Sequence, residues 1–338
     1  MSTQTPTLVG PGKGVQRDRW GRPLITTPTG QVKGYTRCTT FVDALDDKAT
    51  LTAWKQRMTA QGLAHRPDIL AAVKAVADPD SKEGRSELNR LCEQALEAAG
   101  ASAKATIGTT LHGICERWER GEDVTNLVPD GQESTIAAYQ EAVTAHRLQA
   151  VQIETFGVED NLQVAGTWDR IFRTPGGETV IGDLKTGSSL AFGVGKFAMQ
   201  LAVYAHCVQY DPDTATRTPL PGVSQQRALL IHLPEGQGRC DLYWLDIARG
   251  WEAVELAWRV RQHRRVKRDQ WLTPYTGGTT AALAAGTTSE ASAALHAAIS
   301  QAATVQALEA LWAAHQGTWT PEHTEAARAR KTTLTQAA

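Results

Sequence analysis

The sequence contains few cysteines, and no two of them lie close together. The five cysteines of the 338-residue chain are Cys38, Cys92, Cys115, Cys207 and Cys240. An iron–sulfur cluster is held by four cysteines, several of them closely spaced in the sequence, so no such cluster is expected. Scattered, unpaired cysteines are instead typical of a protein that works in a reducing cytoplasm.

The sequence also lacks long hydrophobic runs and a large excess of charge of either sign. No stretch is long enough for a signal peptide or a membrane span, so we expect a cytoplasmic protein without a membrane partner. The net charge of −1 argues against a protein that coats DNA generally. An enzyme that binds DNA needs positive charge only at its contact surface, so that class stays open.

A β-hairpin is predicted over residues 163–185. Residues 163–172 and 178–185 are rich in β-forming side chains with rough alternation, and Thr174-Pro175-Gly176-Gly177 between them has the composition of a turn. With the turn centred on Gly176, positions equidistant from it face each other. Such partners have Cβ atoms about 4.5–5.5 Å apart.

Three ionisable side chains of this hairpin are expected to converge. Asp169 and Asp183 are equidistant from the turn and therefore face each other across the two strands. Lys185 shares the face of Asp183, while Leu184 between them points into the core. Two like charges at this distance repel unless a cation lies between them.

Two facing carboxylates and a lysine have a specific chemical use. Mg²⁺ takes oxygen ligands and is often bound through one or two carboxylates plus substrate phosphate oxygens, which suits phosphodiester hydrolysis. Lys185 could stabilise a charged transition state, or it could help to deprotonate the attacking water. The alternative is a hairpin with a surface aspartate and an ordinary Asp/Lys pair, because D-x-K is common by chance.

Two flanking helices carry further candidate residues. Residues 198–209 are predicted to be helical, with Gln200 and Tyr204 one above the other on one face. Upstream, residues 108–118 have apolar side chains at the i, i+3, i+4, i+7 spacing of a helix, with His112 beside that stripe. A histidine in this place is either a structural residue or a metal ligand.

In order and type these residues resemble the PD-(D/E)xK nucleases, and within that superfamily the RecB-like branch found among phage and CRISPR-associated exonucleases. The resemblance extends over roughly residues 33–272. Its motifs are a helical G-x-x-x-H, a G-x-x-D, a D-x-K-T-G and a Q-x-x-x-Y, matched here by Gly108 and His112, by Gly166 and Asp169, by Asp183, Lys185, Thr186 and Gly187, and by Gln200 and Tyr204.

The resemblance implies a fold and a set of roles. The fold is α/β, a restriction-endonuclease-like core with a central mixed sheet flanked by helices. The implied ligands of Mg²⁺ or Mn²⁺ are His112, Asp169, Asp183 and the Leu184 carbonyl, Lys185 is catalytic, and Gln200 and Tyr204 complete the site. Glu154, at the end of a strand predicted over residues 150–154, is a further candidate ligand, whereas Glu116 is expected on the helix surface.

The remaining sequence suggests four segments. Residues 1–32 are predicted to be a flexible arm, residues 33–272 the nuclease domain, residues 273–290 a linker and residues 291–338 a small C-terminal helical module. Thr320 is predicted to cap a helix that begins at Pro321. The module is a candidate docking site for a single-strand annealing or recombination protein, or it packs on the core.

A cluster of positive charge lies late in a predicted helix. Arg261, Arg264, Arg265 and Arg268 are its candidate DNA-binding residues, and the alternative is a solvated basic face. The sequence as a whole predicts a metal-dependent DNA exonuclease of phage or bacterial recombination or repair. An endonuclease or nickase and a non-catalytic DNA-binding protein on the same fold are the alternatives.

Overall fold

The computed structural model describes residues 14–101, 103–220, 222–275 and 282–336. Contacts between Cα atoms divide the chain into two units, Met1–Arg265 and Val266–Ala338. None of the helices that the structure describes has the length and hydrophobicity needed to span a bilayer.

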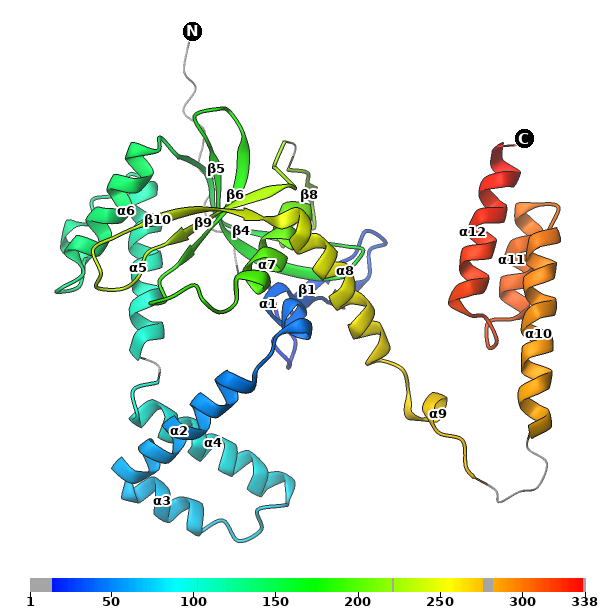
Figure 1. The fold of residues 1–338 in the computed structure, drawn as a ribbon, viewed down its shortest axis with the longest axis horizontal. Helices are drawn as coiled ribbons and strands as arrows, with labels where there is room; N and C mark the ends of the chain where they lie inside the picture. The colour runs from blue at the N-terminus through cyan, green and yellow to red at the C-terminus, as the bar shows by residue number, and fades with distance from the viewer. Residues whose placement is uncertain (1–13, 102, 221, 276–281, 337–338) are drawn as a thin grey trace. The chain divides into compact units, whose positions relative to one another are not determined.

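The first unit is built on an eight-stranded mixed sheet, which confirms the predicted α/β fold with a central sheet (Figure 1). The strand order is β10-β9-β6-β5-β4-β7-β8, with β3 pairing to β5. The strands are β3 (Thr36–Arg37), β4 (Gln149–Glu159), β5 (Val164–Arg173), β6 (Thr179–Lys185), β7 (Val208–Tyr210), β8 (Arg217–Thr218), β9 (Arg227–His232) and β10 (Asp241–Asp246). The β6/β9 and β3/β5 pairs are parallel and the other pairs are antiparallel.

Helices cover both faces of this sheet because its strands carry apolar side chains on both sides. α5 (Ala103–Glu119) and α6 (Glu133–Ala145) pack on one face, in a cluster that includes Leu111, Phe172 and Leu184. α1 (Cys38–Val42), α7 (Val194–His206) and α8 (Ile247–His263) pack on the other, in a cluster that includes Trp168 and Ile181. Figure 1 shows the sheet between these two sets of helices.

The structure places three element boundaries differently from the prediction. The predicted hairpin is confirmed as β5 and β6, but the strand predicted over residues 150–154 is longer, running from Gln149 to Glu159. The helix predicted over residues 198–209 ends at His206. Residues 208–210 form β7 instead, because Val208 and Gln209 pair with β4.

The edge of β5 that faces β6 is interrupted. β4 pairs with β5 along its whole length, so β3 and β6 must share the opposite edge. β3 pairs with Val164 and Ala165, and β6 pairs with residues 170–173. Residues 166–169, here called the β5 gap, lie between these two partners, and no described strand pairs with them on this edge.

The segment expected to be a flexible N-terminal arm is in part ordered. Residues 1–13 lie outside the described residues, but β1 (Leu24–Thr26) and β2 (Val32–Gly34) form an antiparallel ribbon. The expectation was wrong for this part because Ile25 and Tyr35 are buried in a small core with Val158 and Tyr210. Apolar burial therefore outweighs the Gly, Pro and Thr content of the segment.

Between this ribbon and α5 the chain forms a small helical lobe. It consists of the 3₁₀ helix η1 (Asp43–Leu45), α2 (Ala49–His65), α3 (Pro67–Lys74) and α4 (Lys82–Ala98), and a second 3₁₀ helix, η2 (Thr125–Leu127), precedes α6. α2 and α4 pack closely at Gly62, where a Cβ atom would lie 1.8 Å from the Ala95 carbonyl oxygen.

The second unit contains α9 (Arg268–Trp271), α10 (Ala282–Gln301), α11 (Val305–Ala314) and α12 (Pro321–Gln336). Pro321 begins α12 as predicted, and the Thr320 hydroxyl accepts a hydrogen bond from the His323 N–H at 3.3 Å. α10 takes up residues 282–290 of the predicted linker, because an Ala-rich sequence favours a helix. Residues 276–281 of that linker lie outside the described part of the chain.

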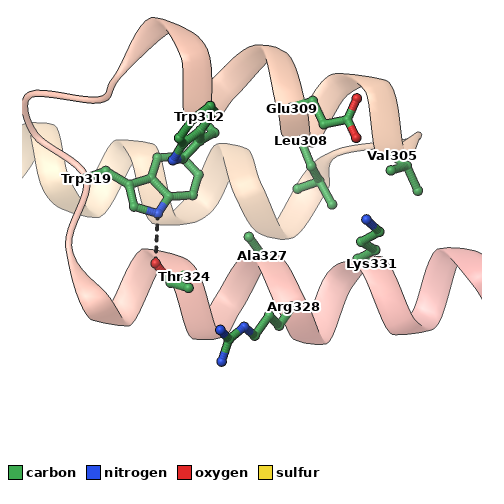
Figure 2. A pocket seen from close by; sticks show the side chains of 9 residues that line it. All are labelled: Val305, Leu308, Glu309, Trp312, Trp319, Thr324, Ala327, Arg328 and Lys331. Atoms are coloured by element: carbon green, nitrogen blue, oxygen red, sulfur yellow. Dashed lines mark hydrogen bonds between the residues drawn. The ribbon is translucent and has the colours of Figure 1, made fainter. Parts of the chain in front are cut away.

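A groove runs between α11 and α12 (Figure 2). Its volume is about 230 Å³, and Leu308, Trp312 and Trp319 supply much of its apolar surface. The Trp319 indole donates a hydrogen bond to the Thr324 hydroxyl at 3.0 Å, which fixes one wall. Figure 2 shows the two tryptophans toward one end of the groove and Lys331 toward the other.

Candidate functional site

Three carboxylates stand in a row across three neighbouring strands. The pair Arg170↔Gly182 sets the register of β5 and β6, so one residue further on Asp169 lies opposite Asp183. On the other side of β5, Glu154 falls between two paired positions of β4 and therefore also lies opposite Asp169. The structure thus brings together the three acidic residues that the sequence had singled out on these strands.

Asp169 lies at the end of the β5 gap and is held from several sides. Its Oδ2 atom accepts a hydrogen bond from the backbone N–H of Leu184 at 3.0 Å, in place of a strand carbonyl. The same oxygen lies 3.5 Å from His112 Nδ1 and 3.8 Å from Arg170 Nη1. The carboxylate is therefore fixed in orientation at the point where β5 and β6 separate.

Asp183 is buried and faces a lysine. Its side chain is 3% exposed, and its Oδ2 lies 2.6 Å from Lys185 Nζ without a hydrogen bond of good geometry. Burial, together with the nearby charge of Asp169, raises the pKa of Asp183 to about 6, against the opposing effect of Lys185. The Lys185 ammonium also lies 4.8 Å from the centre of the Phe197 ring on α7, which limits its freedom.

His112 projects from α5 toward the same place. Its Nδ1 atom is the ring nitrogen that faces Asp169 Oδ2. Burial lowers the pKa of His112, although the Asp169 charge opposes this effect. A neutral imidazole is the form that binds a metal ion.

An open cleft of about 550 Å³ lies in front of His112. Its lining residues are Gly108, Thr109, His112, Gly113, Glu116, Glu154 and Thr186. The cleft therefore borders on two of the recognised motifs, the G-x-x-x-H helix and the D-x-K-T-G strand end. A Cβ atom at Gly108 would lie 2.6 Å from the Thr186 hydroxyl, which explains why this helix position is a glycine.

Glu116 and Glu154 differ from their expected positions. Glu154 lies within β4 rather than at its end, with a φ of +49°, a strained conformation for a residue other than glycine. Glu116 was expected on the helix surface, but it is half-buried and lines the cleft, since it lies one helical turn beyond His112. That i+4 spacing was the signal in the sequence that could have identified it.

The two glutamates interact directly. Each carboxyl group is part of the electrostatic surroundings of the other. Burial and the charge of Glu116 raise the pKa of Glu154 to about 8. Burial is also the main cause of the raised pKa of Glu116. A site that concentrates acidic groups to this degree is suited to a cation.

A buried ion pair that the sequence did not reveal lies beneath the carboxylates. Arg170 is fully buried, and its Nε donates a hydrogen bond to Glu119 Oε2 at 2.6 Å. Glu119 Oε1 also accepts a hydrogen bond from the Tyr139 hydroxyl at 2.5 Å. The guanidinium offsets part of the negative charge around Asp169. No sequence signal marks this pair, because its members are far apart in the chain and belong to no motif.

Gln200 and Tyr204 are adjacent on α7, as predicted. Gln200 Nε2 lies 3.4 Å from the Tyr204 hydroxyl. The Tyr204 ring packs on Gly166 in the β5 gap, where a Cβ atom would lie 2.9 Å from the ring and the hydroxyl. Gly166 is therefore needed so that the tyrosine can approach the strand.

The donor set fits a hard divalent ion. As placed, no three His, Cys, Asp or Glu side chains among the described residues converge in a metal-binding arrangement. However, Asp169 Oδ2 lies 3.5 Å from His112 Nδ1, the Leu184 N–H holds the same oxygen, and Asp183 adds a buried oxygen without a well-formed hydrogen bond. Carboxylate, carbonyl and imidazole donors of this kind suit Mg²⁺ or Mn²⁺.

The four arginines at and after the end of α8 differ in the groups that they contact. Arg261 donates hydrogen bonds to the Thr36 hydroxyl at 3.2 Å and to the Thr40 carbonyl at 3.4 Å, and Arg264 donates one to the Ala44 carbonyl at 3.3 Å. Arg261 therefore also ties α8 to β3 and α1, and Arg264, directly after α8, bonds to η1. Arg265 lies over Trp258, and Arg268 belongs to the second unit. DNA contact by the four stays a prediction.

Comparison with known proteins gives one informative match. A family model described as "PD-(D/E)XK nuclease superfamily" matches residues 70–272, more than half of the chain. A solved structure titled "Crystal structure of SSO0001" is 16% identical and covers 48% of this chain and 78% of its own, with a TM-score of 0.24. A TM-score this low does not establish a shared fold, so nothing is inferred from this likeness. No curated protein matches the sequence significantly.

Proposed function

The chain belongs to the PD-(D/E)XK nuclease superfamily, and from this premise we propose that it is a metal-dependent deoxyribonuclease that degrades DNA from an end. The observation that carries the proposal is the convergence of Asp169, Asp183 and Lys185 where β5 and β6 separate. This arrangement meets the needs of phosphodiester hydrolysis. It provides anionic oxygens for a cation and an ammonium for negative charge that develops during the reaction.

In this proposal the side chains have distinct roles. His112, Asp169, Asp183 and the Leu184 carbonyl would hold Mg²⁺ or Mn²⁺, with Glu154 as a further acidic group on the cleft side. When bound, such an ion lowers the pKa of a water molecule and neutralises charge on a phosphoryl oxygen.

Lys185 would stabilise the negative charge of the transition state. Asp183, at 2.6 Å, orients its ammonium, and the Phe197 ring limits its movement. Gln200 and Tyr204 would complete the wall of the site beside the β5 gap. The orientation of the Asp169 carboxylate supports this proposal, since the Leu184 N–H and His112 both lie against it.

End preference is the part of the proposal that needs its own experiment. Linear, nicked and covalently closed circular duplexes of one sequence should be digested side by side with Mg²⁺ and with Mn²⁺. An exonuclease releases nucleotides from the linear duplex and leaves the closed circle intact. If closed circles are cut as readily as linear duplexes, the protein is an endonuclease or nickase. If none of the three is cut, a non-catalytic DNA-binding role replaces the proposal.

The cellular role is proposed from the resemblance to phage and CRISPR-associated RecB-like exonucleases. We infer a function in phage or bacterial recombination or repair, within the bacterial cytoplasm. The five free cysteines, of which Cys38, Cys115 and Cys207 are buried, are compatible with a reducing compartment.

A partner protein is the remaining element of this proposal. A single-strand annealing or recombination protein would dock on the C-terminal helices. The groove between α11 and α12 supports this assignment, since Trp312 is half-exposed there and Lys331 lies at the rim. Purified candidates can be tested by calorimetric titration against the full chain and its Trp312→Ser variant.

A further inference from the structure

A rigid turn before β1 presents a tryptophan to solvent. Trp20 is 62% exposed, a large fraction for a bulky apolar side chain. Asp18 holds the turn: its Oδ1 accepts hydrogen bonds from the backbone N–H groups of Trp20 and Arg22, both at 2.9 Å. Its Oδ2 accepts a third from Arg22 Nε at 2.7 Å. The exposure of Trp20 is therefore a property of a well-defined turn.

The segment that contains this tryptophan is rich in positive charge. Residues 14–37 carry one carboxylate, that of Asp18, and the cations Arg17, Arg19, Arg22, Lys33 and Arg37, in a chain with a net charge of −1. The guanidinium carbons of Arg19 and Arg22 lie 4.0 Å and 4.9 Å from the centre of the Trp20 ring. Among the described residues, no carboxylate forms an ion pair with Arg19, Lys33 or Arg37.

The turn is connected to the strand that closes one end of the β5 gap. The ribbon register pairs Leu24 with Gly34, and the Tyr35 N–H donates a hydrogen bond to the Pro23 carbonyl at 2.9 Å. The residues just before Pro23 are therefore next to β3, which closes one end of the gap. Asp169 lies at the other end, about 13 Å along the strand from Ala165 at about 3.3 Å per residue.

We propose that Trp20 stacks on a base of single-stranded DNA that lies along the β3 side of the β5 gap, while Arg19 and Arg22 contact its phosphates. The proposal rests on the proposed nuclease function and names the form of DNA that this flank binds. A base can stack on an exposed indole only where it is not already stacked in a duplex, and every base has such a face. The arginines beside the ring can form ion pairs with the phosphate of the nucleotide whose base stacks on Trp20.

Trp244 on β10 provides a matched control. It is 50% exposed, and the guanidinium carbon of Arg227 lies 4.1 Å from its ring centre. Arg227 is, however, paired with Glu178, whose Oε2 lies 2.5 Å from Nη2. The two sites are alike in exposure and cation–π contact, and each has an ion-paired arginine, but Trp20 also has Arg19, for which no ion pair with a described carboxylate is found.

The test is a binding measurement with full-length protein in EDTA, so that no cleavage occurs. Fluorescence anisotropy would give the affinities of wild type, Trp20→Ala, Trp20→Phe and Trp244→Ala for a single-stranded oligonucleotide and for a closed hairpin duplex. Trp20→Ala should bind the single strand on the order of tenfold more weakly, with duplex affinity little changed. Trp20→Phe should keep most of the affinity, and Trp244→Ala should match wild type.

Unchanged single-strand affinity in Trp20→Ala would overturn the inference. An equal loss on single strand and duplex would also overturn it, because the tryptophan would then support a backbone contact or the turn itself. Wild-type protein that binds neither form of DNA would instead remove the proposed function. If wild type and Trp20→Ala bind and cleave DNA equally well, the inference about Trp20 fails but the proposed function stands.

Discussion

The Asp169 carboxylate replaces a backbone partner of Leu184: its Oδ2 accepts the Leu184 N–H at 3.0 Å where β5 and β6 part. This hydrogen bond has two consequences. It orients one carboxylate through the backbone, in addition to the nearby His112 and Arg170 side chains, and it satisfies the Leu184 N–H where β5 no longer pairs with β6. On a continuous hairpin, Asp183 and Lys185 would form an ordinary surface pair. The separation of β5 and β6 at this point distinguishes the pair from that case.

The first prediction concerns Lys185. Lys185→Ala should lower the rate of DNA cleavage on the order of 10²–10³-fold, because its ammonium is proposed to act on transition-state charge. Binding and folding should change little. The rate is measured in single turnover with excess enzyme. Lys196→Ala is the control, since Lys196 is similarly exposed but pairs with Asp43 and Asp46. Turnover of Lys185→Ala at the wild-type rate would remove the assignment.

The second prediction concerns the carboxylate ligands. Asp169→Asn and Asp183→Asn should lose both cleavage and affinity for Mg²⁺ and Mn²⁺, because an amide is a weaker donor to a hard cation than a carboxylate. Calorimetric titration without DNA measures the affinity. Full metal affinity in both variants would mean that the metal binds elsewhere.

The third prediction separates the two metals. His112→Ala should weaken Mn²⁺ binding more than Mg²⁺ binding, because imidazole suits the softer ion. The same titration measures both. The control is His146→Ala, at the C-terminal end of α6 and away from the cleft residues. If the Mn²⁺ affinity of His112→Ala equals that of wild type, the histidine is structural.

The fourth prediction is a pH dependence of stability in EDTA. The pKa of Glu154 is raised to about 8, whereas an unfolded glutamate titrates near pH 4.3. Between these values the folded state holds a proton that the unfolded chain has released, so this group makes the free energy of unfolding fall as pH rises. Glu154→Gln should therefore gain stability relative to wild type from pH 5 to pH 8. Urea unfolding measures it, and Glu141→Gln is an exposed control. A constant difference across this range would contradict the shift.

The fifth prediction concerns the basic segment after α8. Replacing Arg265 and Arg268 with Gln should weaken DNA binding for all sequences alike and reduce the salt slope by roughly one unit for each phosphate that the protein no longer neutralises. Replacing Arg261 and Arg264 should in addition lower the melting temperature, because Arg261 bonds to β3 and α1 and Arg264 bonds to η1. A salt slope equal to that of wild type in both double variants would identify the segment as a solvated face.

The sequence alone determined the hairpin and its two aspartates. Alternation of β-forming residues and a Pro-Gly-Gly turn are local properties, and the distance of each aspartate from that turn fixed their pairing. Gln200 and Tyr204 were predictable for the same reason, since i and i+4 positions meet on any helix. The superfamily followed from motif order, because four motifs in the expected order depend on no long-range contact.

Only the tertiary structure decided how these pieces combine. The placement of Glu116 in the cleft, the buried Arg170–Glu119 pair and the β5 gap all arise from contacts between segments distant in the chain. The ordered ribbon before β3 depends on burial of Ile25 against Val158, a contact that local composition does not encode. Hydrophobic burial is proportional to the area covered, and the area that a segment covers is known only when its neighbours are in place.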